Sequence, residues 1–173
     1  GHIGPFELIP AYLNMMGYKI SVVGKKLYDR RLDKMVVGSR KNFGTTNISS
    51  QDSARKLIKL LKDGYALGIL ADVRTRSVFS EPAEFFGKNT PTVVGPVSLA
   101  RMTGLPLLPM AVYQKHEDSY EMFFGEEFYV ERSDDKQKDI KIGLQTMNRK
   151  LEELILKDPT QWIWYHKRFP NEV

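Results

Sequence analysis

Ala66-Leu67-Gly68-Ile69-Leu70-Ala71 is a continuously apolar run that starts two residues after Gly64 and ends at Asp72. A strand that is buried on both faces shows no polar alternation, so this run predicts a central strand of a parallel sheet. Asp72 follows it directly, and the open sheets of α/β proteins carry their functional side chains at the carboxyl ends of such strands. The run therefore predicts an α/β fold with Asp72 in a functional position.

The rest of the chain alternates between helical and extended patterns. Helices are expected over residues 5–16, 29–38 and 92–103, in a long amphipathic stretch over 140–155, and after a cap at Ser50 or Asp52, where Ala54, Leu57, Ile58 and Leu61 keep the helical period. Strands are expected over 18–23, 45–48, 66–71 and 105–113, with one or two edge strands in 119–131, whereas 73–91 is expected to be irregular. This order predicts a mixed, largely parallel sheet flanked by helices.

The composition is that of one globular domain. The 173 residues are 42% hydrophobic and 27% charged, which suffices for a hydrophobic core. The absence of cysteine excludes disulfides, a thiolate nucleophile and Cys-ligated metals. Three scattered histidines without metal-ligand spacing make a zinc site unexpected, so no metal is predicted. No apolar run approaches the ~18 residues of a membrane-spanning helix, so the chain itself is expected to be soluble.

Positive charge is concentrated near the start of the chain. The net charge is +5, the isoelectric point is about 9.3, and residues 19–56 hold ten Lys or Arg against three Asp. Such a run forms either an ordinary solvated face or a surface for an anionic partner, which could be nucleic acid, membrane phosphate or an acidic protein.

His2-Ile3-Gly4-Pro5-Phe6-Glu7 brings an imidazole and a carboxylate together across a Gly-Pro turn. The turn favours His2 in a loop, Pro5 in the first helical turn and Glu7 near the helix start, from where the carboxylate could reach back to the ring. Histidine exchanges protons near neutral pH, and a carboxylate on its far nitrogen fixes the tautomer. Two simpler interpretations stay open: His2 can be structural or part of a tag, and Glu7 can merely complement the helix dipole.

Several motifs in order along the chain resemble the lysophospholipid acyltransferase superfamily, and within it the late lipid A acyltransferases, which transfer lauroyl and myristoyl chains. The resemblance starts at the His-x4-Glu motif and includes an Arg-x-x-x-Gly element and the strand-end aspartate. The residues that carry it are His2 to Glu7, Arg40 to Gly44, Gly68 to Asp72, Phe85-Phe86-Gly87 with Thr90-Pro91-Thr92, Leu99-Ala100-Arg101 with Gly104 and Pro109, and Trp162-Ile163-Trp164-Tyr165-His166-Lys167-Arg168-Phe169.

The resemblance implies a glycerolphosphate acyltransferase-like fold and an enzyme without metal or redox cofactor. His2 would be the general base on an acceptor hydroxyl and Glu7 would orient it, while backbone N–H groups near Gly4 would stabilise the oxyanion. The acyl donor would be a thioester of acyl carrier protein or coenzyme A, and the acceptor a lipid A precursor at the cytoplasmic face of the bacterial inner membrane. Nucleic acid is not an expected partner.

The resemblance also implies a set of substrate-binding residues. Arg40 would hold a phosphate or an acidic sugar, and Asp72 would contact the acceptor or brace Arg40 or Arg74. Phe85 and Phe86 would line an acyl channel or pack in the core. Trp162, Trp164 and Tyr165 would lie in the core or at the membrane edge, and Lys167 and Arg168 near lipid headgroups.

Two departures from the family pattern qualify the resemblance. Val73 follows Asp72 where the family usually has glutamine, so a polar contact is lost or made differently. The motif begins at the second residue, which predicts a single acyltransferase domain over 1–173 that is a fragment without the N-terminal membrane anchor and first strand. The alternatives are acyl transfer to another glycolipid or a lysophospholipid, and a non-catalytic basic module that binds lipid headgroups or nucleic acid.

Overall fold

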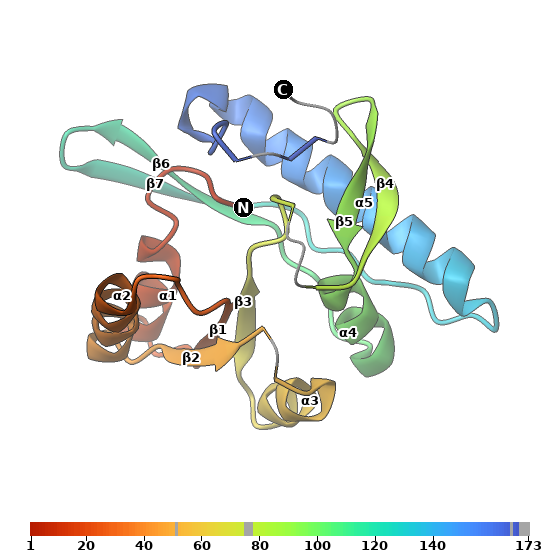
Figure 1. Cartoon of the computed structure of the whole chain (residues 1–173), viewed down its shortest axis with the longest axis horizontal. Helices are drawn as coiled ribbons and strands as arrows, with labels where there is room; N and C mark the ends of the chain where they lie inside the picture. Colours follow the sequence, from red (N-terminus) through yellow and green to blue (C-terminus); the bar gives the residue numbers. More distant parts are fainter. Residues whose placement is uncertain (51, 75–77, 167, 170–173) are drawn as a thin grey trace. The chain divides into compact units, whose positions relative to one another are not determined.

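The computed structural model describes residues 1–50, 52–74, 78–166, 168 and 169 (Figure 1). The chain divides into two compact units. Glu7–Leu70 forms one, called here the sheet unit, and Gly1–Phe6 together with Ala71–Val173 forms the other, the hairpin unit. Both helices and strands occur in each unit, which confirms the predicted α/β class.

The sheet unit is built on three parallel strands in the order β2-β1-β3. Its elements in chain order are α1 (Leu8–Met15), β1 (Ile20–Gly24), α2 (Arg30–Asn42), β2 (Thr46–Ser49), α3 (Ala54–Lys62) and β3 (Ala66–Ile69). The predicted parallel pairing is confirmed here, but the prediction that the 66–71 run is the central strand is wrong. In the described part of the chain β1 is central and starts with three buried residues, whereas β3 lies at one edge and is only partly buried.

The helix limits of this unit differ from the predicted ones. Helix α1 covers Leu8–Met15 and not residues 5–16. Helix α2 continues through Gly38 to Asn42, because a glycine inside a helix only weakens it, and the chain leaves the helix at Gly44 with φ +76°. Helix α3 is capped by Ser53, whose hydroxyl accepts the Lys56 N–H, and not by Ser50 or Asp52.

Two antiparallel hairpins and two helices form the hairpin unit. Its elements are β4 (Ser80–Phe85), β5 (Lys88–Val93), α4 (Gly95–Thr103), β6 (Met110–His116), β7 (Ser119–Phe124), α5 (Lys136–Lys157) and the short 3-10 helix η1 (Pro159–Gln161). The β4–β5 hairpin corrects the expectation of an irregular 73–91 segment. Likewise β6 pairs antiparallel with β7 and does not extend the parallel sheet.

The sequence of the β4–β5 hairpin is not typical of a hairpin. Pro82 and Pro91 face each other in the ladder, and proline is depleted in strands. The two-residue turn consists of Phe86 at φ +48° and Gly87 at φ +71°, and hairpin turns of this kind require two positive φ angles. Phenylalanine seldom adopts that conformation, so the turn carries no sequence signal.

Helix α5 is the main core element of the hairpin unit and lies along β4 (Figure 1). Its predicted apolar face is confirmed, because all of the following are buried: Ile140, Leu144, Met147, Leu151, Leu154 and Ile155. Among the helices that the structure describes, none is both long and apolar enough to cross a membrane.

Candidate active site

The first six residues are held in the hairpin unit by backbone contacts on both sides. Ile3 is fully buried and pairs with Trp162 in an isolated antiparallel bridge, and the Gly4 N–H donates to the Gln161 carbonyl at 2.9 Å. Gly4 has φ +53°, and a Cβ atom there would lie 2.3 Å from the Val112 carbonyl oxygen. Only glycine fits both the conformation and the space, and this fixes the backbone next to His2.

His2 is paired with Asp72 at this place. Its Nδ1 lies 2.9 Å from Oδ1 of Asp72, and its backbone N–H donates to Oδ2 at 2.6 Å. Asp72 is fully buried, whereas 17% of the His2 side chain is exposed. An ionised carboxylate only accepts hydrogen bonds, so the contact assigns the proton to Nδ1 and leaves the Nε2 lone pair available. Among the described residues Nε2 has no hydrogen-bond partner.

The surroundings of Asp72 keep it ionised. Burial by itself raises its pKa, but the hydrogen bonds and the charge contact from His2 oppose this, and the pKa of Asp72 ends below its ordinary value. Trp162 adds a donor, because its indole Nε1–H lies 2.9 Å from Oδ2. A buried anion with several donors is a fixed acceptor for the imidazole.

Glu7 binds a different partner, within the sheet unit. It is the N-cap residue of α1, near the helix start as predicted, while Pro5 lies before the helix and not in its first turn. Arg40 donates to both Glu7 oxygens, from Nε at 2.9 Å and from Nη2 at 2.5 Å. Its Nη1 donates to Oδ1 of Asn47 on β2 at 2.6 Å. The role of Glu7 toward His2 stays a prediction.

The remaining predictions concern three substrate-binding side chains and the backbone N–H groups near Gly4. Phe85 is fully buried in the core, Phe86 packs against that core, and Arg74 is partly buried. The Gly4 and Phe6 N–H groups, expected near the oxyanion, donate to the carbonyls of Gln161 and Gly4, so that expectation fails for these two donors.

The C-terminal motif is only partly buried. Trp162 and Arg168 are buried, whereas Trp164, Tyr165 and His166 are exposed. Arg168 was expected near lipid headgroups, but it is 1% exposed: it donates to the Pro91 carbonyl and to Thr92 Oγ1 and lies over the Phe85 ring. Burial lowers the pKa of Arg168 to about 10, although Asp72 opposes the shift. Lys167 lies outside the described residues.

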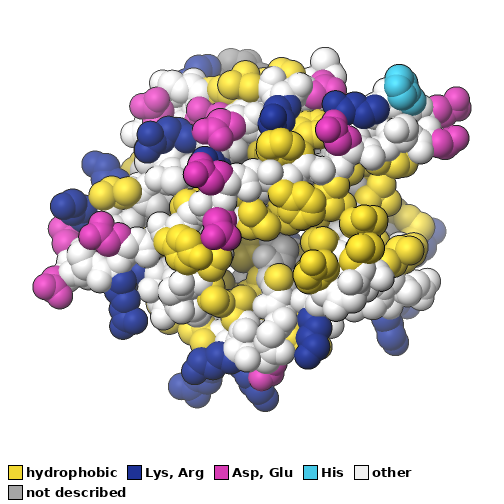
Figure 2. Space-filling model, turned by 180° about the vertical axis from the view of Figure 1, so that it is seen from behind, with side chains coloured by type: hydrophobic (Ala, Val, Ile, Leu, Met, Phe, Trp, Pro, Cys, Tyr) yellow, Lys and Arg dark blue, Asp and Glu magenta, His cyan; other side chains and the backbone are white. Residues whose placement is uncertain are grey.

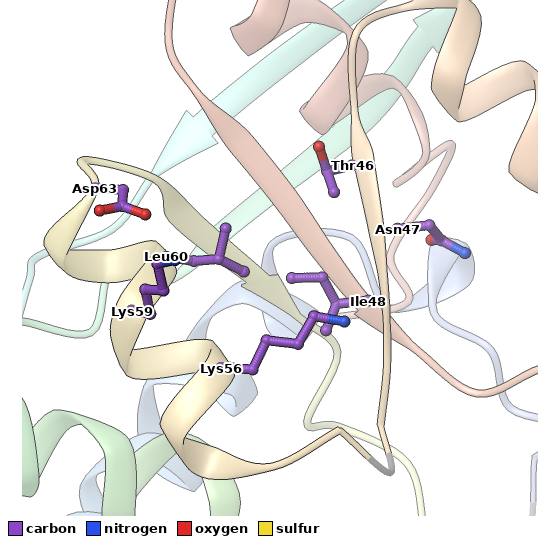
Figure 3. Close-up of a pocket in the computed structure, with 7 residues that line it drawn as sticks. All are labelled: Thr46, Asn47, Ile48, Lys56, Lys59, Leu60 and Asp63. Carbon is purple, nitrogen blue, oxygen red and sulfur yellow. The ribbon is translucent and has the colours of Figure 1, made fainter.

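A cavity of about 280 Å³ lies within the sheet unit, between β2 and α3. Figure 3 shows the Leu60 side chain of α3 pointing toward Ile48 of β2, with the ammonium end of Lys56 beside them. Its lining consists of Thr46, Asn47, Ile48, Lys56, Lys59, Leu60 and Asp63. The lining carries both charges, since Asp63 lies beside the two lysines and Lys56 is paired with Asp52 at 2.8 Å.

Elsewhere the surface is mixed. Figure 2 shows Lys and Arg interspersed with Asp and Glu on one face, with hydrophobic side chains exposed between them. Exposed apolar residues in the sheet unit include Met15 on α1 and Leu32 and Met35 on α2. No group of three or more His, Asp or Glu in the described ranges is placed to hold a metal ion.

The sequence did not predict two hydrogen-bond partners at the site: Asn47, which binds Arg40, and Trp162, which binds Asp72. Asn47 was read only as part of a strand, and Trp162 as a packing or membrane-edge residue. Asn47 had no distinguishing signal. Trp162 had one, because an indole that is buried needs an acceptor for its N–H, and a buried carboxylate needs donors.

Comparisons with known proteins show which family the chain resembles. The family model described as bacterial lipid A biosynthesis acyltransferase matches residues 1–171. The chain is similar to a lipid A biosynthesis palmitoleoyltransferase of Escherichia coli (strain K12) and to a lipid A biosynthesis acyltransferase of Shigella flexneri. Each is 28% identical over 121 residues, which cover 69% of this chain and 38% of the relative.

The matched segment thus spans well under half the length of these curated relatives. The family match, in contrast, extends over nearly the whole chain and includes His2, Asp72 and the C-terminal motif. The chain belongs to the bacterial lipid A biosynthesis acyltransferase family.

Proposed function

We propose that this chain carries the reaction centre of an enzyme that transfers a fatty acyl group from an acyl carrier protein thioester to a hydroxyl of a lipid A precursor. The observation that carries the proposal is the His2–Asp72 pair, with Nδ1 bound to a buried carboxylate and Nε2 available. Family membership supplies the class of reaction and of acceptor. The site of action would be the cytoplasmic face of the inner membrane.

In the proposed reaction His2 is the general base. Nε2 takes the proton of the acceptor hydroxyl, and the oxygen attacks the thioester carbonyl carbon. The C–S bond then breaks, and the imidazolium returns its proton to the leaving thiolate. Base catalysis by a positioned side chain contributes about 10²–10⁴-fold. Every proton is accounted for by His2 itself, so the reaction needs no further acid.

Asp72 orients His2 in this proposal, and Glu7 acts on Arg40. Asp72 fixes the tautomer and stabilises the imidazolium, as a carboxylate does in hydrolase triads. Glu7 and Asn47 hold three of the five N–H donors of Arg40. The two remaining donors suit a phosphate oxygen of the acceptor, and 13% of the Arg40 side chain is exposed. The two carboxylates would therefore affect different kinetic constants.

The test compares substitutions in the longest natural protein that contains the chain, in a membrane extract. Labelled lauroyl-, myristoyl- and palmitoleoyl-carrier protein are supplied with a tetra-acylated lipid A precursor. We expect His2→Ala to abolish transfer and Asp72→Asn to lower kcat by about 10²–10⁴-fold. Glu7→Gln should mainly raise KM for the phosphorylated acceptor.

Three outcomes count against the proposal in different ways. Transfer that survives His2→Ala would exclude the base. Transfer only to a lysophospholipid or another glycolipid would replace the acceptor but keep the chemistry. Binding of anionic lipid or nucleic acid that His2→Ala leaves unchanged, without any transfer, would favour a binding module.

A further inference from the structure

The indole N–H of Trp162 contacts Asp72, one member of the candidate catalytic pair His2–Asp72. We propose that Trp162 is a positioning residue, whose indole N–H holds the Asp72 carboxylate so that Oδ1 faces the His2 ring. This inference rests on the proposed function for its kinetic consequence, but its structural part stands on the hydrogen bonds themselves.

The two oxygens of Asp72 have different partners. Oδ2 accepts the His2 backbone N–H at 2.6 Å and the Trp162 Nε1–H at 2.9 Å, while Oδ1 contacts Nδ1 of the His2 ring at 2.9 Å. The terminal torsion of an aspartate is broad, so the carboxylate could otherwise turn about its Cβ–Cγ bond. Two donors on Oδ2 resist that rotation and reserve Oδ1 for the imidazole.

The indole is well placed to act as a rigid donor. Trp162 is 4% exposed, and its ring packs against Phe85 at 5.9 Å and Trp164 at 4.7 Å between ring centroids. Its backbone pairs with Ile3, the neighbour of His2. Trp162 therefore holds the pair in two ways, through its side-chain contact with the Asp72 carboxylate and through its backbone bridge to Ile3, the residue after His2.

Trp164 offers a matched control. It is 56% exposed, and its Nε1–H donates to the Pro159 carbonyl at 2.6 Å, away from Asp72. Replacing either tryptophan by phenylalanine removes one indole N–H and keeps an aromatic ring. Only the substitution at 162 should change the hydrogen bonding of His2.

Other charged or titratable groups face the pair and must be held constant. Arg168 acts on Asp72 through its charge, and the His166 ring stacks on the His2 ring at 6.4 Å between centroids. Neither of these is altered in Trp162→Phe or Trp164→Phe. The two variants are therefore compared with the wild type at the same pH and salt concentration.

The structural readout is the NMR signal of the His2 ring in the chain without substrate. In the wild type we expect a proton-bearing Nδ1 with a downfield, slowly exchanging N–H resonance. Trp162→Phe should weaken that resonance and raise the share of the Nε2–H tautomer, while Trp164→Phe leaves both unchanged. In the transfer assay Trp162→Phe should lower kcat roughly 10- to 100-fold with KM nearly constant.

A second measurement covers the case in which Trp162→Phe does not fold. In an otherwise wild-type chain, Asp72→Asn should shift the Trp162 indole N–H resonance and leave that of Trp164 in place. An unchanged His2 resonance in folded Trp162→Phe, or an unmoved Trp162 resonance in Asp72→Asn, would overturn the inference. Absence of any transfer by the wild type would count against the proposed function alone.

Discussion

Two carboxylates are candidates for the partner of His2, and only one of them, Asp72, contacts its ring in the structure. Glu7 is five residues away, whereas Asp72 is 70 residues away. The contact at Nδ1 is made by Asp72, and both oxygens of Glu7 are bound to Arg40. Burial separates the two further, because 44% of the Glu7 side chain and none of Asp72 is exposed. A buried, multiply bonded carboxylate is the better-defined orienting group.

The lowered pKa of Asp72 predicts a specific dependence of stability on pH. The unfolded chain takes up the Asp72 proton near pH 4, whereas the folded protein keeps this carboxylate ionised to lower pH. The stabilisation is thus complete above the unfolded pKa and is lost as pH falls toward the folded pKa. In that window the Asp72 contribution to the free energy of unfolding falls by up to about 1.4 kcal/mol per pH unit.

Urea unfolding of the wild type and of Asp72→Asn between pH 5 and pH 3 measures this contribution. Other aspartates with lowered pKa values, such as Asp139 and Asp158, contribute equally to both proteins and cancel in the difference. The stability of Asp72→Asn, although lower throughout, should fall less steeply. Parallel curves would show that the Asp72 carboxylate gains no net charge stabilisation from folding.

At the level of elements, the packing of α5 on α4 depends on one small residue. A Cβ atom on Gly143 would lie 2.5 Å from Cγ1 of Val97, which is fully buried on α4. Valine cannot move its branched side chain without a change of rotamer or backbone. The periodicity of α5 predicted its apolar face, but it could not show that α4 approaches at this glycine.

Gly143→Ala should therefore destabilise the protein in spite of the higher helix propensity of alanine. Alanine gains up to about 1 kcal/mol of propensity, and overpacking costs about 1–3 kcal/mol, so we expect a net loss of about 1 kcal/mol in the free energy of unfolding. Gly38 in α2 is the matched control, because a Cβ there meets nothing within 4 Å. Gly38→Ala should stabilise by about 0.5–1 kcal/mol.

Urea unfolding of both single variants decides this point. A double variant, Gly143→Ala with Val97→Ala, should recover part of the loss, because the smaller side chain makes room for the new methyl group. If Gly143→Ala were as stabilising as Gly38→Ala, the close approach of α4 and α5 would be refuted.

At the level of the whole molecule, charge is divided unequally between the two units. Residues 7–70 carry 12 Lys or Arg and five Asp or Glu, a net charge of +7. The hairpin unit carries 14 basic and 16 acidic residues, a net charge of −2. The positive field therefore originates in the sheet unit, where α2 also exposes Leu32 and Met35. Exposed apolar and basic groups on one helix suit an anionic lipid surface.

The charge division predicts which basic residues matter for membrane binding. Replacing Arg30, Arg31 and Lys34, which are exposed in α2, by glutamine should weaken binding to vesicles with 30% anionic lipid by about 100-fold, at ~1 kcal/mol per residue. Replacing the exposed Lys136, Lys138 and Lys141 of α5 by glutamine is the control and should change little. Equal losses would mean that only the net charge of the molecule acts. Binding by the wild type should also fall with salt.

Local patterns determined much of this protein from the sequence by itself. The helical period identified α5 and its buried face, the positive-φ glycines at 17, 64 and 104 followed their helices, and the alternation of elements predicted parallel strands. The motif set from His2 to the C-terminal Trp-rich segment predicted the family, which the match over residues 1–171 confirms. These features depend on residues that are near one another in the chain or on the order of motifs.

Only the tertiary structure decided which strands and side chains pair. In the sheet, β1 and not β3 is the central strand, and the sequence could not show this because apolar content does not specify a strand's neighbours. The tertiary structure formed the β4–β5 hairpin through a positive φ at Phe86, which sequence propensity disfavours. It also joined His2 to Asp72 and Trp162, across 70 and more residues. Contacts at such separations arise from packing of the whole unit, where burial selects the partners of each polar group.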